Sequence, residues 1–239
     1  MSLESTPLSA RRRPDRQIYT WAALFAVIIV FAGFARTYYL KSHFDAPALT
    51  NLIHAHGLLM TAWFTLFFVQ VRLIASHRVD LHRRLGWFGG ALAVAILAVG
   101  TMTAITGARE GHSPGPPPLV FLAIPLGDMV VFAVLVSLGI HYRNRAAIHK
   151  RLLLLSSMAI LTAAIARIPL DALKQTGLPG FFGATDILIL VVVVIDAIRH
   201  RRLHPAFGWG FAFVLVSQIG RFAIAGTPQW LSFAQWLTR

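Results

Sequence analysis

The sequence predicts an all-α protein, a polytopic bundle of seven transmembrane helices. Hydrophobic residues make up 56% of the 239 residues and charged residues only 13%, whereas soluble domains average about 25% charged residues. The apolar residues gather in seven runs, each close to the roughly 20 residues that a helix needs to cross a bilayer. The chain has no cysteine, which excludes disulfides, iron–sulfur clusters and thiolate metal sites.

The elements follow in order from the N-terminus. Residues 1–16 are polar and contain Pro7 and Pro14, so we expect a disordered tail. The transmembrane domain covers 17–226, and its spans are expected to be helical because a backbone in lipid must satisfy its own hydrogen bonds. Residues 227–239 carry aromatic residues at helical spacing and predict an amphipathic helix in the interface. The seven predicted spans, the sixth being the shortest, are 18–40, 50–73, 86–106, 119–141, 152–170, 183–198 and 206–225.

The net charge of +13 is distributed as in a membrane protein. Most of the Lys and Arg residues lie in short clusters on one side of the predicted spans, so the positive-inside rule places the N-terminus in the cytoplasm and the C-terminus outside. The basic groove with interleaved aromatic residues that single-stranded nucleic acid requires is not visible. The predicted environment is therefore the lipid bilayer, and nucleic-acid binding is excluded.

A short repeat marks the cytoplasmic starts of three spans. His82, His149 and His204 each follow a basic loop and stand immediately before a predicted helix. This arrangement predicts one leading helix followed by three helical hairpins, 50–106, 119–170 and 183–225. Repeats of this kind in membrane proteins often place a site at their interface.

Polar residues gather in the outer half of the predicted bundle. Ionisable groups are costly in hydrocarbon and commonly mark functional sites. His54 and His56 point about 200° apart around a helix, so His56 is paired with the carboxylates of later hairpins rather than with His54. The predicted metal ligands are His54, His56, Asp128 and Asp186, and the predicted cofactor-binding residues are His54, His56, Arg167, Gln218 and Arg221.

A structural interpretation of this layer stays open. Arg167 and Arg221 are close enough to helix ends for their side chains to reach the headgroups. Asp186 can serve as an N-terminal charge on its helix. Buried ion pairs between these groups would also satisfy them without any ligand.

Haem is the alternative cofactor to a metal ion. Ligation by two histidines requires residues on different helices at one depth, and in the outer half only the second span supplies histidines. At the cytoplasmic edge histidines are frequent but stand among arginines, where solvation and helix capping are the commoner roles. These residues are His77, His82, His141, His149, His200 and His204.

Several short runs resemble a family of uncharacterised bacterial multi-pass inner-membrane proteins. They are Thr37-Tyr38-Tyr39-Leu40, His54-Ala55-His56-Gly57, Thr61-Ala62-Trp63, Gln70, His82-Arg83-Arg84-Leu85-Gly86, His149-Lys150-Arg151-Leu152 and Ala166-Arg167. The resemblance covers most of the chain. It implies a bacterial inner-membrane protein and no assigned activity.

Three functions are compatible with these patterns. The leading hypothesis is the binding of a metal ion or haem in a redox or cofactor-handling role. The second is a carrier for protons or a small anion, with Asp128 as the switching carboxylate. The third is a non-catalytic assembly subunit with a membrane-protein partner or a second copy of the chain. Whether the protein is an enzyme stays open.

Overall fold

The fold was analysed in a computed structural model that describes residues 8–44 and 47–239. The described residues form helices and connecting segments, without a β-strand. In chain order the elements are α1 (Leu8–Phe34), η1 (Ala35–Tyr39), η2 (Lys41–His43), α2 (Asn51–Ala75), α3 (Val79–Arg109), α4 (Pro118–Phe121), α5 (Ala123–His141), α6 (Ala146–Ala159), α7 (Thr162–Ile165), α8 (Asp171–Lys174), α9 (Gly177–His200), α10 (Pro205–Ile224) and α11 (Pro228–Leu237).

Seven helical segments are long and apolar enough to cross a membrane, which confirms the predicted number of spans. The sixth was wrongly predicted to be the shortest: it covers Gly177–His200, 24 residues, whereas Ala146–Ile165 and Pro205–Ile224 have 20 each. Pro179 lies in the first turn of α9, where proline is tolerated because the N–H it lacks would be unpaired there. The Gly- and Pro-containing stretch before residue 183 therefore extends the helix rather than preceding it.

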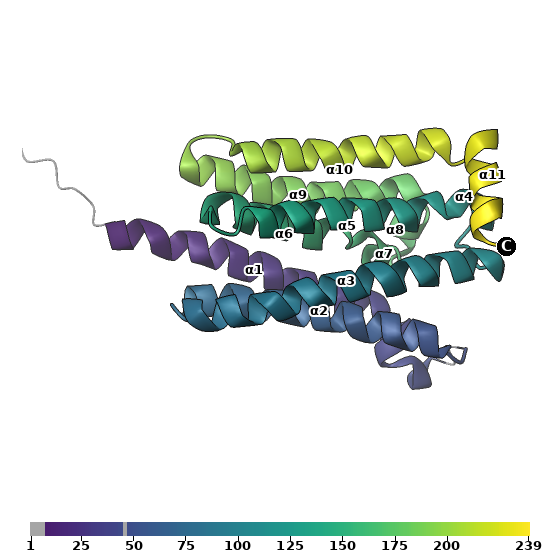
Figure 1. Cartoon of the computed structure of the whole chain (residues 1–239), viewed down its shortest axis with the longest axis horizontal. Helices are drawn as coiled ribbons and strands as arrows, with labels where there is room; N and C mark the ends of the chain where they lie inside the picture. Colours follow the sequence, from purple (N-terminus) through teal and green to yellow (C-terminus); the bar gives the residue numbers. More distant parts are fainter. Residues whose placement is uncertain (1–7, 45–46) are drawn as a thin grey trace, which may run out of the picture.

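The long helices run side by side along one axis (Figure 1). Helix α2 packs against α3, α5 packs against α6, and α10 packs mainly against α5 and α6. The span that contains α6 is the centre of the bundle, because 72% of its apolar window is buried compared with 22% for the windows of α2 and α3. Exposed apolar side chains such as Ile187, Ile198 and Ile219 cover the outer surface, as expected for helices in contact with lipid.

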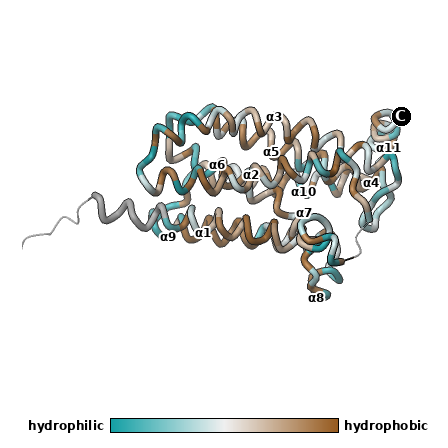
Figure 2. The backbone as a smooth tube through the Cα atoms, turned by 90° about the horizontal axis from the view of Figure 1, so that it is seen from below, coloured by the Kyte–Doolittle hydropathy of each residue, from teal (hydrophilic) through white to brown (hydrophobic). Residues whose placement is uncertain are grey.

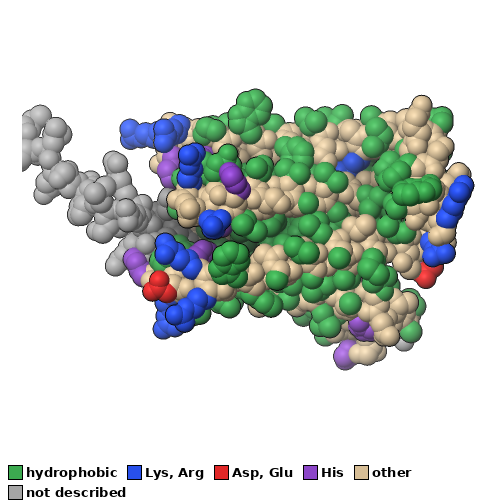
Figure 3. All heavy atoms as spheres, viewed as in Figure 1, with side chains coloured by type: hydrophobic (Ala, Val, Ile, Leu, Met, Phe, Trp, Pro, Cys, Tyr) green, Lys and Arg blue, Asp and Glu red, His purple; other side chains and the backbone are tan. Residues whose placement is uncertain are grey.

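The two ends of the bundle differ in charge. Figure 2 shows hydrophilic colouring toward the ends and hydrophobic colouring along the middle of the helices. In Figure 3, Lys and Arg side chains gather at the end where α3 begins, with histidines among them. We call this the basic end, defined by Arg72, Arg78, Arg83, Arg84, Arg143, Arg145, Lys150, Arg151, Arg199, Arg201 and Arg202.

The two terminal regions carry helices. Helix α1 begins at Leu8, earlier than the boundary predicted for a tail over 1–16, and residues 1–7 of that tail lie outside the described residues. At the other terminus, α11 occupies the predicted stretch 227–239. The Thr227 side chain accepts a hydrogen bond from the Trp230 backbone N–H, and the indole N–H of Trp230 donates to the Leu119 carbonyl at 2.8 Å.

The three histidines of the repeat occupy two kinds of position, the first turn of a helix and the N-cap. The prediction that all three histidines precede their helices is wrong for His82 and His149, which lie in the first turn of α3 and α6. Only His204 precedes its helix, as the N-cap of α10. The helices begin earlier than hydropathy indicates because Lys and Arg are good helix formers outside the membrane core.

Candidate functional site

At the end opposite the basic end, Arg221 and Asp128 form a buried ion pair between α10 and α5. An Nη atom of Arg221 donates to Asp128 Oδ1 at 2.5 Å and to the Ile124 carbonyl at 3.3 Å. The Arg221 Nε and the other Nη each lie 3.2 Å from Ser217 Oγ. Gly127 leaves room for this side chain, because a Cβ there would lie 2.2 Å from Arg221 Nε. The guanidinium is therefore satisfied within the protein.

Gln218 and Asp186 form a second polar pair in the same half of the bundle. The Gln218 amide donates to Asp186 Oδ1 at 3.0 Å and connects α10 with α9. Gln218 is buried and Asp186 half-buried. Four of the sequence-predicted residues thus form two pairs, each between an α10 side chain and a carboxylate on a neighbouring helix.

The other three predicted residues lie apart from these pairs. His54 is exposed and His56 half-buried, as expected for neighbours on opposite sides of a helix. Arg167 donates to the Ala163 carbonyl of its own chain segment and lies over the Phe34 ring. His56 Nδ1 is buried and has no hydrogen-bond partner in the part of the chain that the structure describes.

No group of three or more His, Asp or Glu residues is arranged to hold a metal ion within residues 8–44 and 47–239. The predicted metal site of His54, His56, Asp128 and Asp186 is therefore not assembled in the structure. Both carboxylates are instead engaged with α10 side chains.

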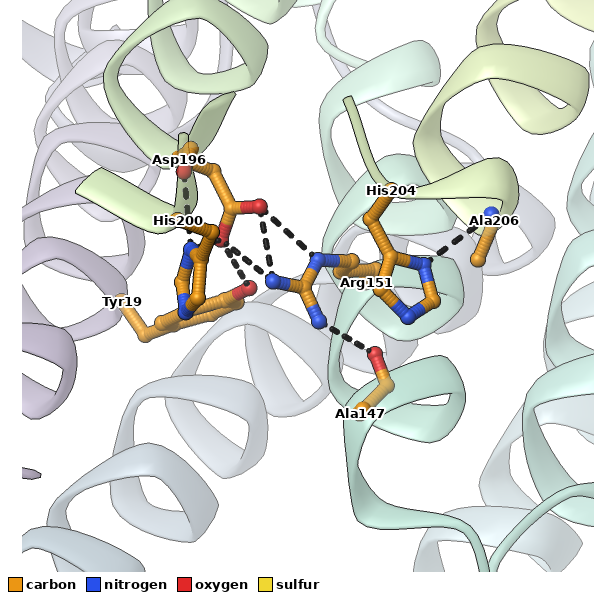
Figure 4. A network of polar contacts seen from close by, with 7 residues as sticks. All are labelled: Tyr19, Ala147, Arg151, Asp196, His200, His204 and Ala206. Atoms are coloured by element: carbon orange, nitrogen blue, oxygen red, sulfur yellow. Dashed lines mark hydrogen bonds and ion pairs between the residues drawn. The ribbon is translucent and has the colours of Figure 1, made fainter. Parts of the chain in front are cut away.

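A second buried ion pair lies near the basic end (Figure 4). Arg151 on α6 and Asp196 on α9 are 2% and 1% exposed. Arg151 Nε lies 3.0 Å from Asp196 Oδ2, and Nη2 lies 2.9 Å from Oδ1. The Tyr19 hydroxyl donates to Asp196 Oδ1 at 3.2 Å, and the remaining Nη of Arg151 donates to the Ala147 carbonyl. This network joins α1, α6 and α9.

Two histidines lie beside that network, and each makes a hydrogen bond to the backbone. His200 Nδ1 lies 2.8 Å from the Asp196 carbonyl. His204 Nδ1 accepts the Ala206 backbone N–H at 3.1 Å and caps α10. Partial burial, and then the positive charge of Arg151, lower the pKa of His204, whereas Asp196 acts in the opposite direction. The neutral imidazole that a cap requires is favoured by this environment.

A second polar group at the basic end contains buried atoms that have no hydrogen-bond partner among the described residues. The rings of His82 on α3 and His149 on α6 lie 6.1 Å apart between centroids and nearly perpendicular. His149 Nδ1 lies 2.8 Å from the Gly139 carbonyl. Since a carbonyl only accepts, Nδ1 carries the hydrogen, and the other ring nitrogen of a neutral His149 is an acceptor.

His82 and Gln70 contribute the unsatisfied atoms at this place. His82 Nδ1 and Gln70 Oε1 are both buried, and neither has a hydrogen-bond partner among residues 8–44 and 47–239. Gln70 belongs to α2, and its side-chain nitrogen would lie 4.0 Å from a Cβ added at Gly86, one turn after His82. Buried polar atoms without partners are rare in proteins and call for a water, an ion or a ligand. We refer to His82, His149 and Gln70 as the histidine pair site.

The sequence contained signals for both groups at the basic end. His82 and His149 occupy equivalent positions of the repeat, which indicated that they share a depth. Their assignment as solvated or capping groups is correct for the cap at His204 but not for His82. Asp196 is an acidic residue within the apolar run of the sixth span, and Arg151 immediately precedes the fifth run; this pairing across spans was missed.

Comparisons with protein-family models, with curated proteins and with solved structures find no match for this chain.

Proposed function

We propose that this multi-pass membrane protein holds a metal-centred cofactor between His82 and His149, in a redox or cofactor-handling role. The single observation that carries the proposal is the unsatisfied histidine pair site. It combines a buried, unpartnered nitrogen of His82 with a His149 ring whose tautomer leaves one nitrogen open. Histidines that bind metals commonly donate their other N–H to a carbonyl or carboxylate, as His149 does to Gly139.

The location of the proposed site differs from the outer layer favoured by the sequence. Asp128, Asp186 and Arg221 already have protein partners, so binding a ligand there would require those bonds to break. Among the described residues, by contrast, His82 Nδ1 and Gln70 Oε1 of the histidine pair site have no hydrogen-bond partner. Leaving such atoms unpaired costs about 1–3 kcal/mol for each, and a group bound at the histidine pair site would offset that cost.

Purified protein provides the direct test. Metal analysis and an absorption spectrum of the detergent-solubilised chain should reveal one metal-containing group per chain. His82→Ala and His149→Ala should each remove it. His141→Ala is the matched control, because His141 is exposed at the same end and its ring packs against the neighbouring Tyr142. Retention of the metal by both variants, or its absence from the wild type, would refute the proposal.

The proposed location is the inner membrane of a bacterium, with the basic end in the cytoplasm, as the positive-inside rule favours. The absence of cysteine from the chain makes single-cysteine labelling clean. Ser76→Cys at the basic end and Ser113→Cys at the opposite end should react with an impermeant thiol reagent from opposite sides. Labelling of Ser76→Cys from outside intact spheroplasts would reverse the proposed orientation.

A carrier for protons or a small anion is the second candidate function. It is favoured by the Asp128–Arg221 pair, because ionisable pairs inside membranes often serve transport. In liposomes, Asp128→Asn should abolish proton or anion flux while Ser113→Ala, in the connecting segment, should leave it intact. Flux that survives Asp128→Asn contradicts this function.

A further inference from the structure

A groove beside the C-terminal end of α2 combines apolar side chains with two arginines. Its volume is about 370 Å³, within the roughly 300–1,000 Å³ that is typical of ligand sites. Its described lining residues are Phe68, Val69, Arg72, Leu73, Ser76 and Arg78. These residues are different from those of the histidine pair site, so the groove is a separate feature of the molecule.

The chemistry of this groove changes along the axis of α2. The lining residues from Phe68 to Ser76 follow the i, i+1, i+4, i+5, i+8 spacing of one helix face, and they cover about 12 Å of the axis. Phe68 and Val69 lie inside the apolar span, which ends at Ala75, whereas Ser76 and Arg78 lie beyond that end. The groove therefore runs from hydrocarbon depth, where it is apolar, to headgroup depth, where it is cationic.

The two arginines of the groove are exposed and are not engaged by acceptors of the described chain. Carbonyls in the last turn of α2 could attract a cation, but they already accept the backbone N–H groups of Ser76, His77 and Arg78. The Ser76 hydroxyl also donates to the Arg72 carbonyl, at 2.9 Å. Although Asp80 follows closely in sequence, neither guanidinium forms an ion pair with a carboxylate of residues 8–44 and 47–239. Both charges are therefore available to an external anion.

An anionic phospholipid matches this combination of groups. A guanidinium binds a phosphate through two parallel hydrogen bonds, and basic residues next to a membrane span attract anionic headgroups. A free phosphate ion would use only the cationic part of the groove and leave Phe68 and Val69 without a partner. A zwitterionic lipid would bring its ammonium group close to the many Lys and Arg residues of the basic end, which repel it.

We infer that this groove binds one anionic phospholipid. Arg72 and Arg78 hold its phosphate, and one acyl chain follows Phe68, Val69 and Leu73 toward the middle of the bilayer. The site includes the turn between α2 and α3, so a bound lipid stabilises the end of this hairpin at headgroup depth. The inference goes beyond the proposed function and does not depend on it.

Native mass spectrometry of the detergent-purified chain measures lipid binding directly. The chain is titrated with phosphatidylglycerol and, in parallel, with phosphatidylcholine. The wild type should retain a single phosphatidylglycerol, and at a lower lipid concentration than phosphatidylcholine. Arg72→Gln and Arg78→Gln should each weaken this binding about fivefold, the usual effect of one basic residue at an anionic membrane surface. Arg199→Gln is the matched control, because it removes the same charge from the last turn of α9 at the same end.

A second pair of variants tests the apolar part of the groove without changing any charge. In Val69→Trp the larger side chain fills space that the acyl chain would occupy, so the retention of phosphatidylglycerol should fall. Val94→Trp is the control, because Val94 is exposed on α3 and does not line the groove. An excess of inorganic phosphate should leave the retention of phosphatidylglycerol unchanged, since phosphate lacks the acyl chain.

Several results would overturn the inference. Unchanged lipid binding when Arg72→Gln and Arg78→Gln are combined would exclude the groove as the site. Equal weakening by Arg199→Gln would reduce the effect to the general charge of the basic end. Equal retention of phosphatidylcholine would remove the preference for an anionic headgroup, and displacement by inorganic phosphate would make the site one for the free ion.

Discussion

Arg151 and Asp196 join two spans through a bidentate ion pair that is almost completely shielded, with 2% and 1% of the side chains exposed. The carboxylate also accepts the Tyr19 hydroxyl, so the three spans that contain α1, α6 and α9 meet at one group. Removing one partner leaves the other charge buried and uncompensated, which is more costly than never having formed the pair.

We therefore expect Asp196→Asn to lower the free energy of unfolding by about 3–5 kcal/mol. Arg151→Met combined with Asp196→Leu removes both charges and should cost less than either single change. Thermal unfolding of the purified variants in one detergent measures this order. A double variant less stable than Asp196→Asn would indicate that the pair is net stabilising.

The crossing of α1 over α7 depends on a glycine. A Cβ on Gly33 would lie 2.1 Å from the carbonyl oxygen of Ala164, and a backbone atom cannot turn aside as a side chain does. Gly33→Ala should destabilise the protein by roughly 1–3 kcal/mol, the usual cost of forced overpacking. Gly220→Ala is the matched control, because it lies within α10 with no atom within 4 Å of the added Cβ. It should be neutral or stabilising by up to about 1 kcal/mol.

Apparent melting temperatures of the two glycine variants, measured side by side, check this contrast. Equal melting temperatures for Gly33→Ala and the wild type would mean that α1 and α7 separate in the native protein without cost.

His204 should make stability depend on pH. Its pKa is lowered in the folded protein, chiefly by burial and then by the charge of Arg151, so the unfolded chain binds a proton more readily. Stability from this residue is fully present above its unfolded pKa of about 6.5. It is lost as the pH falls from there through the folded pKa, because the protonated ring can no longer accept the Ala206 N–H.

His204→Asn isolates this contribution, since asparagine is a good N-cap that does not titrate. Between pH 7.5 and pH 5, the wild type should lose more stability than the variant, with a slope difference of at most about 1.4 kcal/mol per pH unit. Melting curves across that range provide the measurement. Parallel curves would exclude His204 as the titrating group.

The sequence predicts those structural properties that are set by consecutive residues, and not those that are set by the packing of distant helices. The spans were predictable because each follows from the hydropathy of some 20 consecutive residues. The outer polar layer was predictable by depth, and Asp128 and Arg221 lie within it. Their partnership was not, because the rotation of α5 and α10 about their axes is decided by packing. Asp196 was hidden for the same reason: nothing local indicates that it faces Arg151.

The histidine pair site also depends on contacts between helices that the local sequence does not reveal. The repeat placed His82 and His149 at equivalent positions, but equivalence in sequence does not bring α3 and α6 together. The buried and unpartnered state of His82 Nδ1 depends on neighbours from other helices. Without it, histidines among arginines are best interpreted as solvated.

The last prediction compares the two buried ion pairs. Asp128 is 15% exposed and Asp196 1%. When Asp128 is neutralised, Arg221 keeps Ser217 Oγ and the Ile124 carbonyl as acceptors. Asp128→Asn should therefore cost only about 1–2 kcal/mol, less than Asp196→Asn, and the variant should reconstitute into liposomes. Unfolding and flux are measured on the same preparation. A folded variant without flux supports the carrier, whereas a loss of stability as large as that of Asp196→Asn makes Asp128 a structural residue.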